Sequence, residues 1–385
     1  MFEFATTSRI IFGSGSLEQA PSIIAERGRR VLLVTGGGLG RETALLTLLQ
    51  QNHFAIDLLR VKREPGVEDI ANGVELARAK GIEVVVGLGG GSAIDAAKAI
   101  AAVATNPGEL LDYLEVIGRG LALSAPGIPC IAIPTTAGTG AEVTRNAVID
   151  VPEQAIKVSL RGPQVLPQVA IIDPSLALTV PAAVTAATGF DALTQVIEPF
   201  LSTRANSLTD ALSREAMRLA ARSLGFAHAN GADLGAREDM AQVSLFGGLC
   251  LSNAGLGAVH GLAGPLGGMF RAPHGAVCAV LLGPTMAANL KAIVASNLPN
   301  RDDLLQRFRE IGQILTARQE ATAEDSIAWV NSLAQSLRIP KLSSYGVGPE
   351  RFGPIIERAQ RASSMKCNPV KLQPEELAWI LRTAL

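Results

Sequence analysis

The stretch 83–95 reads Glu-Val-Val-Val-Gly-Leu-Gly-Gly-Gly-Ser-Ala-Ile-Asp, and it decides the fold of the first half of the chain. It begins as a short β-branched run typical of a buried strand, and after the glycines a helical pattern opens at Ser92. Backbone amides in a turn without Cβ atoms can approach a pyrophosphate, and the start of the helix adds partial positive charge. The spacing of Ser92 and Asp95 also permits a capping interaction. We interpret the stretch as a phosphate-binding strand–turn–helix unit, with a plain tight turn as the alternative.

Two further loops of this kind follow predicted strands. The segment 36–40, Gly-Gly-Gly-Leu-Gly, comes directly after the apolar run 31–35. The segment 134–142 follows another apolar run and carries Thr135, Thr136 and Thr139, whose hydroxyls suit a ribose or a phosphate. Its alternative interpretation is a hydroxyl-rich turn that caps the next element. Several glycine-rich turns on one sheet strengthen the prediction that this half of the chain binds a nucleotide.

The order of predicted elements gives the fold class. Up to about residue 180, β-branched runs alternate with amphipathic helical patterns, which is typical of a parallel sheet covered by helices. Beyond Pro181 the strand signals fade, and Ala- and Leu-rich helical patterns continue to the C-terminus. We therefore expect an α/β dinucleotide-binding domain at 1–180, an all-helical domain at 181–385, and an accessible cleft between them. The predicted strands are 31–35, 83–86, 128–133 and 169–173. A helix is predicted over 67–80, and Gly81 is expected to end it. In the second half, breaks between helices are predicted at 229–231, 298–300 and 339–340.

Composition and charge restrict the class of partner. The 385 residues are 48% hydrophobic and 18% charged, so the chain can form a large core and intrinsic disorder is not expected. The 34 Lys and Arg residues nearly balance the 35 Asp and Glu residues. This balance leaves no basic surface for nucleic acid or an anionic membrane, so a small-molecule partner is expected.

Cysteine usage and the start of the chain favour a reducing cytoplasm. The four cysteines lack CxxC spacing and stand among apolar or small residues, which predicts buried, inert thiols. The N-terminus has no cationic segment followed by an apolar one, as a secretory signal would have. The apolar stretch 245–270 is long enough to span a bilayer, but glycines, Asn253, His260 and Pro265 interrupt it, so we expect buried helices there.

A carboxylate and two histidines are the candidate catalytic groups. Asp191 and Gln195 are four residues apart, so on a helix both side chains lie on one side, one turn apart. His260 and His274 lie in apolar surroundings, where an imidazole needs a partner. One interpretation is a helix cap and two histidines bound to backbone carbonyls. The other is an Asp-His-His ligand set for a divalent catalytic metal with an open position.

Taken together, these motifs resemble the iron-containing (group III) alcohol dehydrogenase family, which includes maleylacetate reductases and is related to glycerol dehydrogenases and dehydroquinate synthases. The resemblance covers nearly the whole chain. The matched segments are 89–95, 134–142, 189–198, 260–261 and 273–275, in the order that the family has them. The resemblance implies a dehydroquinate synthase-like architecture, with a Rossmann-like N-terminal domain, a helical domain that holds the metal, and a homodimer.

The resemblance also assigns roles to individual residues. The implied metal positions are Asp191, His260 and His274. The implied contacts with NAD or NADP are Gly90, Gly91, Ser92 and Asp95 for the pyrophosphate region, Thr135, Thr136 and Thr139 for phosphate, ribose or nicotinamide, and Asn146 and Lys157 with less support from a surrounding motif.

The sequence departs from the family pattern at three positions. Gln195 stands where many members have a histidine ligand, and an amide is a poorer donor for Fe²⁺ or Zn²⁺. Gly264 stands where members often carry another histidine near the nicotinamide, so a proton-relay side chain is missing. Gly36 replaces an aspartate that binds the adenosine ribose, which removes a carboxylate that would repel a 2′-phosphate and admits NADP. Arg41, five residues later, is a candidate to pair with such a phosphate, and the alternative is a solvated arginine at a helix start.

We therefore expect a cytoplasmic oxidoreductase that transfers a hydride between NAD(P)(H) and a small alcohol or aldehyde in the interdomain cleft. A divalent metal on Asp191, Gln195, His260 and His274 would polarise the substrate oxygen; without a metal, His260 or His274 would donate a hydrogen bond or a proton to it. One alternative is a maleylacetate reductase-like, metal-independent reductase of an unsaturated keto acid, whose carboxylate Arg145 would recognise. Another is a non-catalytic dinucleotide-binding protein.

Overall fold

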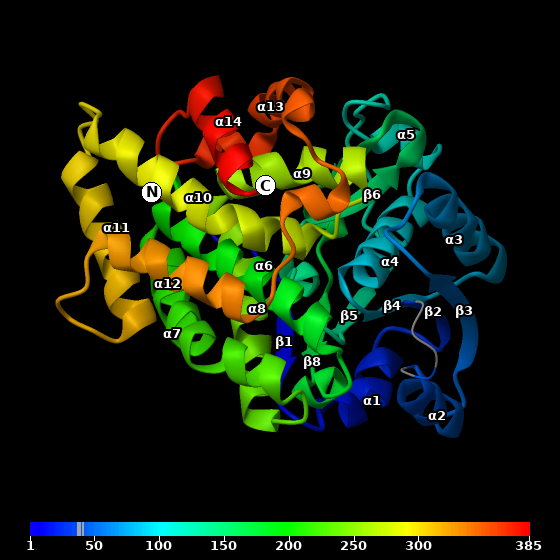
Figure 1. Ribbon diagram of the computed structural model, residues 1–385. Helices are drawn as coiled ribbons and strands as arrows, with labels where there is room; N and C mark the ends of the chain where they lie inside the picture. The colour runs from blue at the N-terminus through cyan, green and yellow to red at the C-terminus, as the bar shows by residue number, and fades with distance from the viewer. Residues whose placement is uncertain (37–39, 41) are drawn as a thin grey trace. The chain divides into compact units, whose positions relative to one another are not determined.

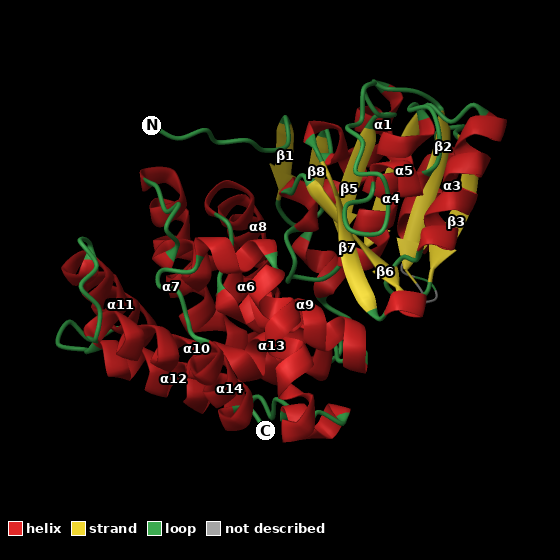
Figure 2. Cartoon of the chain, turned by 90° about the horizontal axis from the view of Figure 1, so that it is seen from above, coloured by secondary structure: helices red, strands yellow, loops and turns green. Residues whose placement is uncertain are grey.

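The computed structural model describes residues 1–36, 40 and 42–385. It divides into two compact units, one formed by Ala5–Thr179 and the other by Val180–Leu385 together with Met1–Phe4. The first four residues thus group with the second unit, although the sequence placed them in the first domain. Within the described residues the strands belong to the first unit, and the second unit is built from helices (Figure 2).

The first unit is built on a parallel sheet. Its described residues form six strands in the order β1-β8-β5-β4-β2-β3, and all of their pairings are parallel. The strand bounds are β1 Arg9–Phe12, β2 Arg30–Gly36, β3 Ala55–Val61, β4 Val84–Gly89, β5 Cys130–Pro134 and β8 Val169–Ile172 (Figure 1). An antiparallel pair, β6 Asn146–Val151 and β7 Ile156–Arg161, lies outside this sheet.

Helices cover both faces of the sheet because alternate side chains of each strand point to opposite sides. On one face Leu32 and Val34 pack with residues of α3 and α4, including Ile70 and Ile100. On the other face, side chains such as Val31 and Leu33 pack with α1 and α2. The helix bounds are α1 Ala20–Ala25, α2 Thr43–Gln51, α3 Val67–Lys80, α4 Gly91–Ala104 and α5 Leu110–Tyr113. This is the predicted α/β arrangement.

The strand order locates a ligand crevice. From β2 the chain moves outward to β3, and from β4 it moves in the opposite direction to β5. In open parallel sheets such a reversal opens a crevice at the carboxyl ends of the strands. Here β2 and β4 are the adjacent strands at the reversal, and each ends in a glycine-rich segment, at Gly36 and Gly89.

Most local predictions in this unit are confirmed. All four predicted strands are present, and α3 spans the predicted residues and ends at Gly81, whose φ of 58° is the left-handed conformation that glycine adopts easily. The capping prediction for α4 is wrong, because the helix begins one residue earlier with Gly90 as its N-cap. The Asp95 carboxylate instead accepts hydrogen bonds from Lys98 Nζ at 3.3 Å and the Val148 amide at 3.0 Å.

A buried ion pair within α4 is therefore hydrogen-bonded to the segment that follows β5. The Lys98 side chain is fully buried, and besides Asp95 its Nζ lies within hydrogen-bonding distance of Ala141 O, Thr144 Oγ1 and Asn146 O. Burial raises the pKa of the Asp95 carboxyl, and Lys98 opposes this by attraction. Burial also raises the pKa of the neighbouring Glu142 carboxyl to about 7. The loop that carries the predicted cofactor-binding threonines is thus held in place by Lys98.

The second unit consists of helices, as predicted. Helices α6, α7 and α8 pack on one another, and α10 packs on α6 and α9. The bounds are α6 Ala182–Leu201, α7 Ser207–Ala229, α8 Leu234–Ala254, α9 Ala258–Phe270, α10 His274–Val294, α11 Arg301–Thr316, α12 Ala323–Ser336, α13 Phe352–Arg361 and α14 Pro374–Thr383. Each predicted break at 229–231, 298–300 and 339–340 lies at or between helix ends.

The long apolar stretches of this unit are packed inside it. The predicted buried helices at 245–270 are the end of α8 and all of α9, which meet at a 102° bend. Helix α10 is also long and apolar enough to cross a membrane, but 72% of its most apolar 18-residue segment is buried within the structure. Its hydrophobicity is therefore used in helix packing, as in the core helix of a folded domain.

Candidate active site

Three polar side chains lie along one face of α6. Asp191, Gln195 and Glu198 are separated by four and three residues, which places them on successive turns of the same side. All three are buried, with exposed fractions of 2%, 3% and 6%. A helix that buries this much polar surface in an apolar unit needs partners for it, and α9 and α10 supply them.

Helix α9 begins at a site capped by distant side chains. Its N-cap residue, Gly257, has no side chain that could accept a hydrogen bond. Instead, the Ala258 amide donates to Asn368 Oδ1 at 3.0 Å, and the Val259 amide donates to Glu198 Oε1 at 2.7 Å. A Cβ atom on Gly257 would lie 2.8 Å from each of these oxygens, so only glycine fits there. This arrangement fixes the start of α9, where the next residue is His260.

Glu198 orients the His260 ring. Its Oε2 lies 2.6 Å from Nδ1 of His260, while its Oε1 is held by the Val259 amide. A carboxylate acceptor at this distance keeps a proton on Nδ1 and leaves Nε2 to face Asp191. Nε2 lies 3.3 Å from Asp191 Oδ1.

The second histidine opens α10. His274 follows Pro273, and the next residue, Gly275, approaches α6 so closely that a Cβ atom would lie 2.3 Å from the Ala187 carbonyl oxygen. Ala187 is one turn before Asp191, so this close approach brings His274 toward the carboxylate. Nε2 of His274 lies 3.7 Å from Asp191 Oδ1, and the two imidazole rings are tilted by 53° with centroids 5.4 Å apart.

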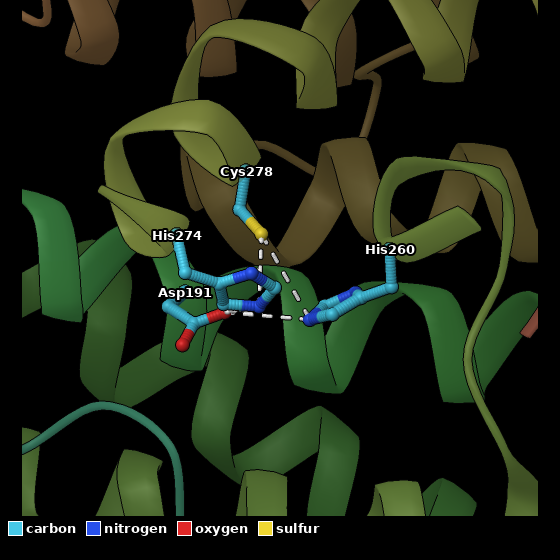
Figure 3. Close-up of side chains that lie close together, drawn as sticks. All are labelled: Asp191, His260, His274 and Cys278. Carbon is cyan, nitrogen blue, oxygen red and sulfur yellow. Dashed lines mark hydrogen bonds and ion pairs between the residues drawn. The ribbon is translucent and has the colours of Figure 1, made fainter. Parts of the chain in front are cut away.

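A cysteine completes the cluster. Cys278, one turn after His274 on α10, places its Sγ 3.7 Å from Nε2 of His274 and 3.9 Å from Nε2 of His260. Figure 3 shows the side chains of Asp191, His260, His274 and Cys278 converging from three helices. One donor atom from each residue lies within 4.8 Å of the others. The prediction that all four cysteines are buried is confirmed, and the Cys278 sulfur faces the two histidine nitrogens.

The charges of the cluster are strongly coupled. Burial raises the pKa of the Asp191 carboxyl, but attraction to His274 and His260 and a hydrogen bond with Gln195 outweigh it and lower the pKa. Burial lowers the pKa of His260, yet Cys278 and Glu198 raise it well above the ordinary value. A cluster that attracts a proton this strongly also attracts a metal cation in the proton's place.

Unsatisfied oxygens support a cation at this point. Asp191 Oδ1 and Gln195 Oε1 are buried, and neither accepts a hydrogen bond from any residue in the described part of the chain. Buried polar atoms without partners are rare in folded proteins. Asp, His and Cys side chains are the donor types that divalent transition metals use, so the residues fit such an ion.

The predicted phosphate-binding loops also come together. Gly90 and Gly91 at the start of α4 face the threonine loop, because a Cβ atom would lie 3.2 Å from Thr136 Oγ1 at the first position and 2.9 Å from Thr139 Oγ1 at the second. Thr135 is buried and donates its amide to the Gly89 carbonyl. This glycine cradle at the start of a 14-residue helix fits a pyrophosphate.

Gly36 lies at the carboxyl end of the neighbouring strand, and its N atom would be 3.4 Å from a Cβ atom on Gly89. A Cβ atom on Gly36 itself would meet no described atom within 4 Å, so the position is open to a side chain. The sequence prediction for Arg41 falls outside the described residues.

Some of the other predicted cofactor-binding residues form hydrogen bonds or ion pairs within the protein. Ser92 is half-buried in the first turn of α4. Both oxygens of Asp95 are bound within the protein, and Lys157 Nζ binds Glu64 Oε1 at 2.7 Å. Asn146 begins β6 and offers its carbonyl to Lys98. For Asp95 and Lys157 the structure gives a structural partner, so a cofactor role for them stays a prediction.

Cys278, which belongs to the cluster, and Glu198, which orients His260, were not assigned roles from sequence. Cys278 is four residues after His274, a helical spacing that could have pointed to it. Glu198 shares the α6 face with Asp191, but its role depends on where α9 begins, which linear spacing does not reveal.

Comparisons with known proteins find similar sequences over nearly the whole chain. Residues 7–174 match the family model described as iron-containing alcohol dehydrogenase, and residues 185–385 match the model of the family's C-terminal part. Alcohol dehydrogenase 4 of Saccharomyces cerevisiae is 35% identical over 379 residues, which is 97% of this chain and 96% of the yeast protein.

Solved structures are similar over the full chain. The crystal structure of a 1,3-propanediol oxidoreductase matches with a TM-score of 0.90 and 34% identity, covering 100% of both chains. The sulfoacetaldehyde reductase of Bifidobacterium kashiwanohense, solved in complex with NAD⁺, matches with a TM-score of 0.87 and 25% identity, covering 100% of this chain and 98% of the other.

Proposed function

Because this chain belongs to the iron-containing alcohol dehydrogenase family, we propose that it transfers a hydride between NAD(P)(H) and a small alcohol or aldehyde. The observation that carries the proposal is the convergence of Asp191, His260, His274 and Cys278 from three helices of the second unit. A buried group of such donors is costly without a cation, and it favours a metal-assisted enzyme over a metal-independent, maleylacetate reductase-like one.

The first unit would bind the nucleotide at the carboxyl ends of β2, β4 and β5. The amides at the start of α4 and the hydroxyls of Thr136 and Thr139 would hold the pyrophosphate, because the glycines let these threonines lie close to the start of the helix. The end of β2 at Gly36 would lie beside the adenosine ribose. The NAD⁺ complex of the similar sulfoacetaldehyde reductase supports a nicotinamide nucleotide here.

The second unit would bind the metal through Asp191, His260 and His274. When bound, the nicotinamide supplies the hydride acceptor or donor and the divalent ion polarises the substrate oxygen. Glu198 keeps the proton of His260 on Nδ1, so Nε2 keeps its lone pair toward Asp191. Gln195 hydrogen-bonds the Asp191 carboxylate and restricts its orientation. Asp191, Gln195 and Glu198 are buried, and burial strengthens the electrostatic interactions of these groups.

The relatives suggest the substrate class. The names alcohol dehydrogenase and 1,3-propanediol oxidoreductase describe enzymes of an alcohol and of a diol. We therefore propose a small alcohol as the substrate of oxidation and the matching aldehyde as the substrate of reduction.

The proposal predicts metal-dependent turnover. Purified without chelators, the protein should reduce small aldehydes with NADH or NADPH, monitored by the loss of nicotinamide absorbance. Chelation should abolish the activity, and added Zn²⁺ or Fe²⁺ should restore it, because the donor cluster needs the cation. If neither nucleotide supports hydride transfer to a panel of aldehydes, with or without these metals, the proposal is wrong.

Gly36→Asp should change the choice of nucleotide. The position has room for a Cβ atom, so the carboxylate is tolerated, and it would repel the 2′-phosphate of NADPH. We expect kcat/KM with NADPH to fall by about tenfold or more, the equivalent of about 1.4 kcal/mol, with little loss for NADH.

The matched control is Gly225→Asp, which adds the same side chain at an exposed position of α7 where no described atom lies within 4 Å of a Cβ atom. It should change neither rate. Equal losses with both nucleotides for Gly36→Asp would contradict the placement of the adenosine ribose.

A further inference from the structure

The cluster contains one donor more than the three metal positions that the family resemblance assigns. We propose that the Cys278 thiolate is the fourth ligand of the divalent metal, in the role that a histidine at position 195 has in many family members. This inference rests on the proposed function, since it concerns the same site. It makes the centre an Asp-His-His-Cys site instead of one completed by an amide or water, and the substrate oxygen would then bind as a fifth ligand, as catalytic zinc sites allow.

The distances between donor atoms support four-coordinate binding. Four ligands at the bond lengths usual for zinc, arranged tetrahedrally, lie about 3.3–3.8 Å from one another. The measured separations are 3.3 and 3.7 Å from Asp191 Oδ1 to the two imidazoles and 3.7 and 3.9 Å from Cys278 Sγ to the same nitrogens. These four separations are close to the spacing that one small cation requires, and the donor atoms of all four residues lie within 4.8 Å of one another.

The position of Cys278 on α10 explains why its sulfur reaches the centre. Residues four apart on a helix lie on the same face, so Cys278 and His274 point in the same direction (Figure 3). The cysteine is completely buried, and the atoms facing its sulfur are the two histidine nitrogens. This thiol therefore faces polar metal-binding groups inside a helical core.

Donor chemistry favours the thiolate as well. Asp191 and Cys278 are anionic ligands, and the two imidazoles bind metals in their neutral form. The Glu198 carboxylate is already bound by the Val259 amide and His260 Nδ1. Because a thiolate binds a transition metal more strongly than a neutral amide does, Cys278 completes the ligand set better than Gln195.

Gln195 has another task in this arrangement. It hydrogen-bonds the Asp191 carboxylate and packs against Gly247 of α8, where a Cβ atom would lie 3.1 Å from the glutamine Cβ. Gln195 is thus a positioning residue for the carboxylate. A thiolate is also a softer ligand than an imidazole, so this centre should prefer Zn²⁺ over Fe²⁺.

Cobalt substitution tests the inference without relying on turnover. Metal-free protein is titrated with Co²⁺, and the near-ultraviolet absorption is recorded, because a thiolate bound to Co²⁺ gives an intense charge-transfer band that nitrogen and oxygen ligands do not give. We expect the band at one equivalent in the wild type. Cys278→Ser should remove it and weaken Zn²⁺ binding by at least about 100-fold, the upper end of what loss of an outer partner costs.

The matched control is Cys250→Ala, which removes another buried cysteine of the same unit. Cys250 contacts Ser213 and the Thr209 carbonyl, and burial raises its pKa to about 12, so it stays a thiol. This variant should keep the band. A band that survives Cys278→Ser, or a wild type that binds Co²⁺ without one, would overturn the proposal.

X-ray absorption at the zinc edge gives a second measurement that needs no variant. The zinc-loaded wild type should show one sulfur among its nearest neighbours, and a shell of nitrogen and oxygen alone would refute Cys278 ligation. Aldehyde reduction by the same preparation separates the two proposals. Turnover without a sulfur ligand rejects only the inference, while a sulfur ligand without turnover on any aldehyde rejects only the proposed activity.

Discussion

Asp191→Asn is expected to lower kcat/KM for aldehyde reduction by about 10³-fold, the size of effect seen when a group that stabilises developing charge is lost. The asparagine has nearly the same shape and can still accept a hydrogen bond from Gln195, so packing on α6 should be preserved. What disappears is the negative charge whose Oδ1 lies 3.3 Å from His260 and 3.7 Å from His274. The metal content of the purified protein should fall together with the rate.

The measurement combines steady-state kinetics with elemental analysis of the same sample, and circular dichroism checks that the variant folds. Asp302→Asn is the control, because the Asp302 side chain is 91% exposed at the start of α11 and lies outside the cluster. It should behave as the wild type. A folded Asp191→Asn protein that retains its metal and works within about threefold of the wild-type rate would show that this carboxylate does not belong to the centre.

The parts of the fold that could be predicted from sequence are those with strong local signals. The helix at Val67–Lys80 has a regular apolar period and a glycine that stops it, so its ends could be predicted to the residue. The strand and glycine turn before α4 are equally local, since a fully buried central strand is a continuous apolar run. In both cases the information lies within about fifteen residues of sequence.

Edge elements were missed for a physical reason. β1 has only four residues, and β3 includes Asp57 and Arg60, because each lies at an edge of the sheet where polar side chains are tolerated. The antiparallel pair β6 and β7 alternates between buried and less buried residues, as a half-buried strand does. That alternation was present in the sequence and could have been recognised.

The candidate metal cluster could be predicted only in part. The resemblance selected Asp191, His260 and His274 because each lies in a recognisable motif. The inclusion of Cys278 depends on how the starts of α9 and α10 are held against α6, through the Glu198 cap and the close approach of Gly275 to Ala187. The helical spacing of four residues relates Cys278 to His274, but it does not show that α9 and α10 meet at α6, so the sequence suggested an inert thiol.

Lys98→Met is expected to lower the free energy of unfolding of the first unit by about 3–5 kcal/mol, the usual cost of removing one partner of a buried ion pair. Methionine fills much of the space of the lysine stem, so the loss is mainly electrostatic. The Asp95 carboxylate would remain buried without its cation, and the oxygens of Ala141, Thr144 and Asn146 would lose their donor.

The loss should also grow with pH. Burial already raises the pKa of Asp95, and removing the attraction of Lys98 would raise it further. A carboxyl whose pKa is higher in the folded than in the unfolded state binds more protons when folded, so stability is lost as the pH rises through the folded-state pKa. The difference between variant and wild type should therefore be smaller at acidic pH, where Asp95 is protonated in both states, than at neutral pH.

Two measurements, urea unfolding and amide hydrogen exchange, can locate this effect. Both tryptophans, Trp329 and Trp379, belong to the second unit, so their fluorescence during urea unfolding reports on that unit. Hydrogen exchange of the amides in β4, α4 and β6 reports on the first unit. Faster exchange should be confined to the first unit, because the contacts of Lys98 lie there. Lys291→Met, at an exposed site near the end of α10, is the control and should leave both signals unchanged. A Lys98→Met protein as stable as the wild type at neutral pH would show that the pair contributes nothing to holding the threonine loop against α4.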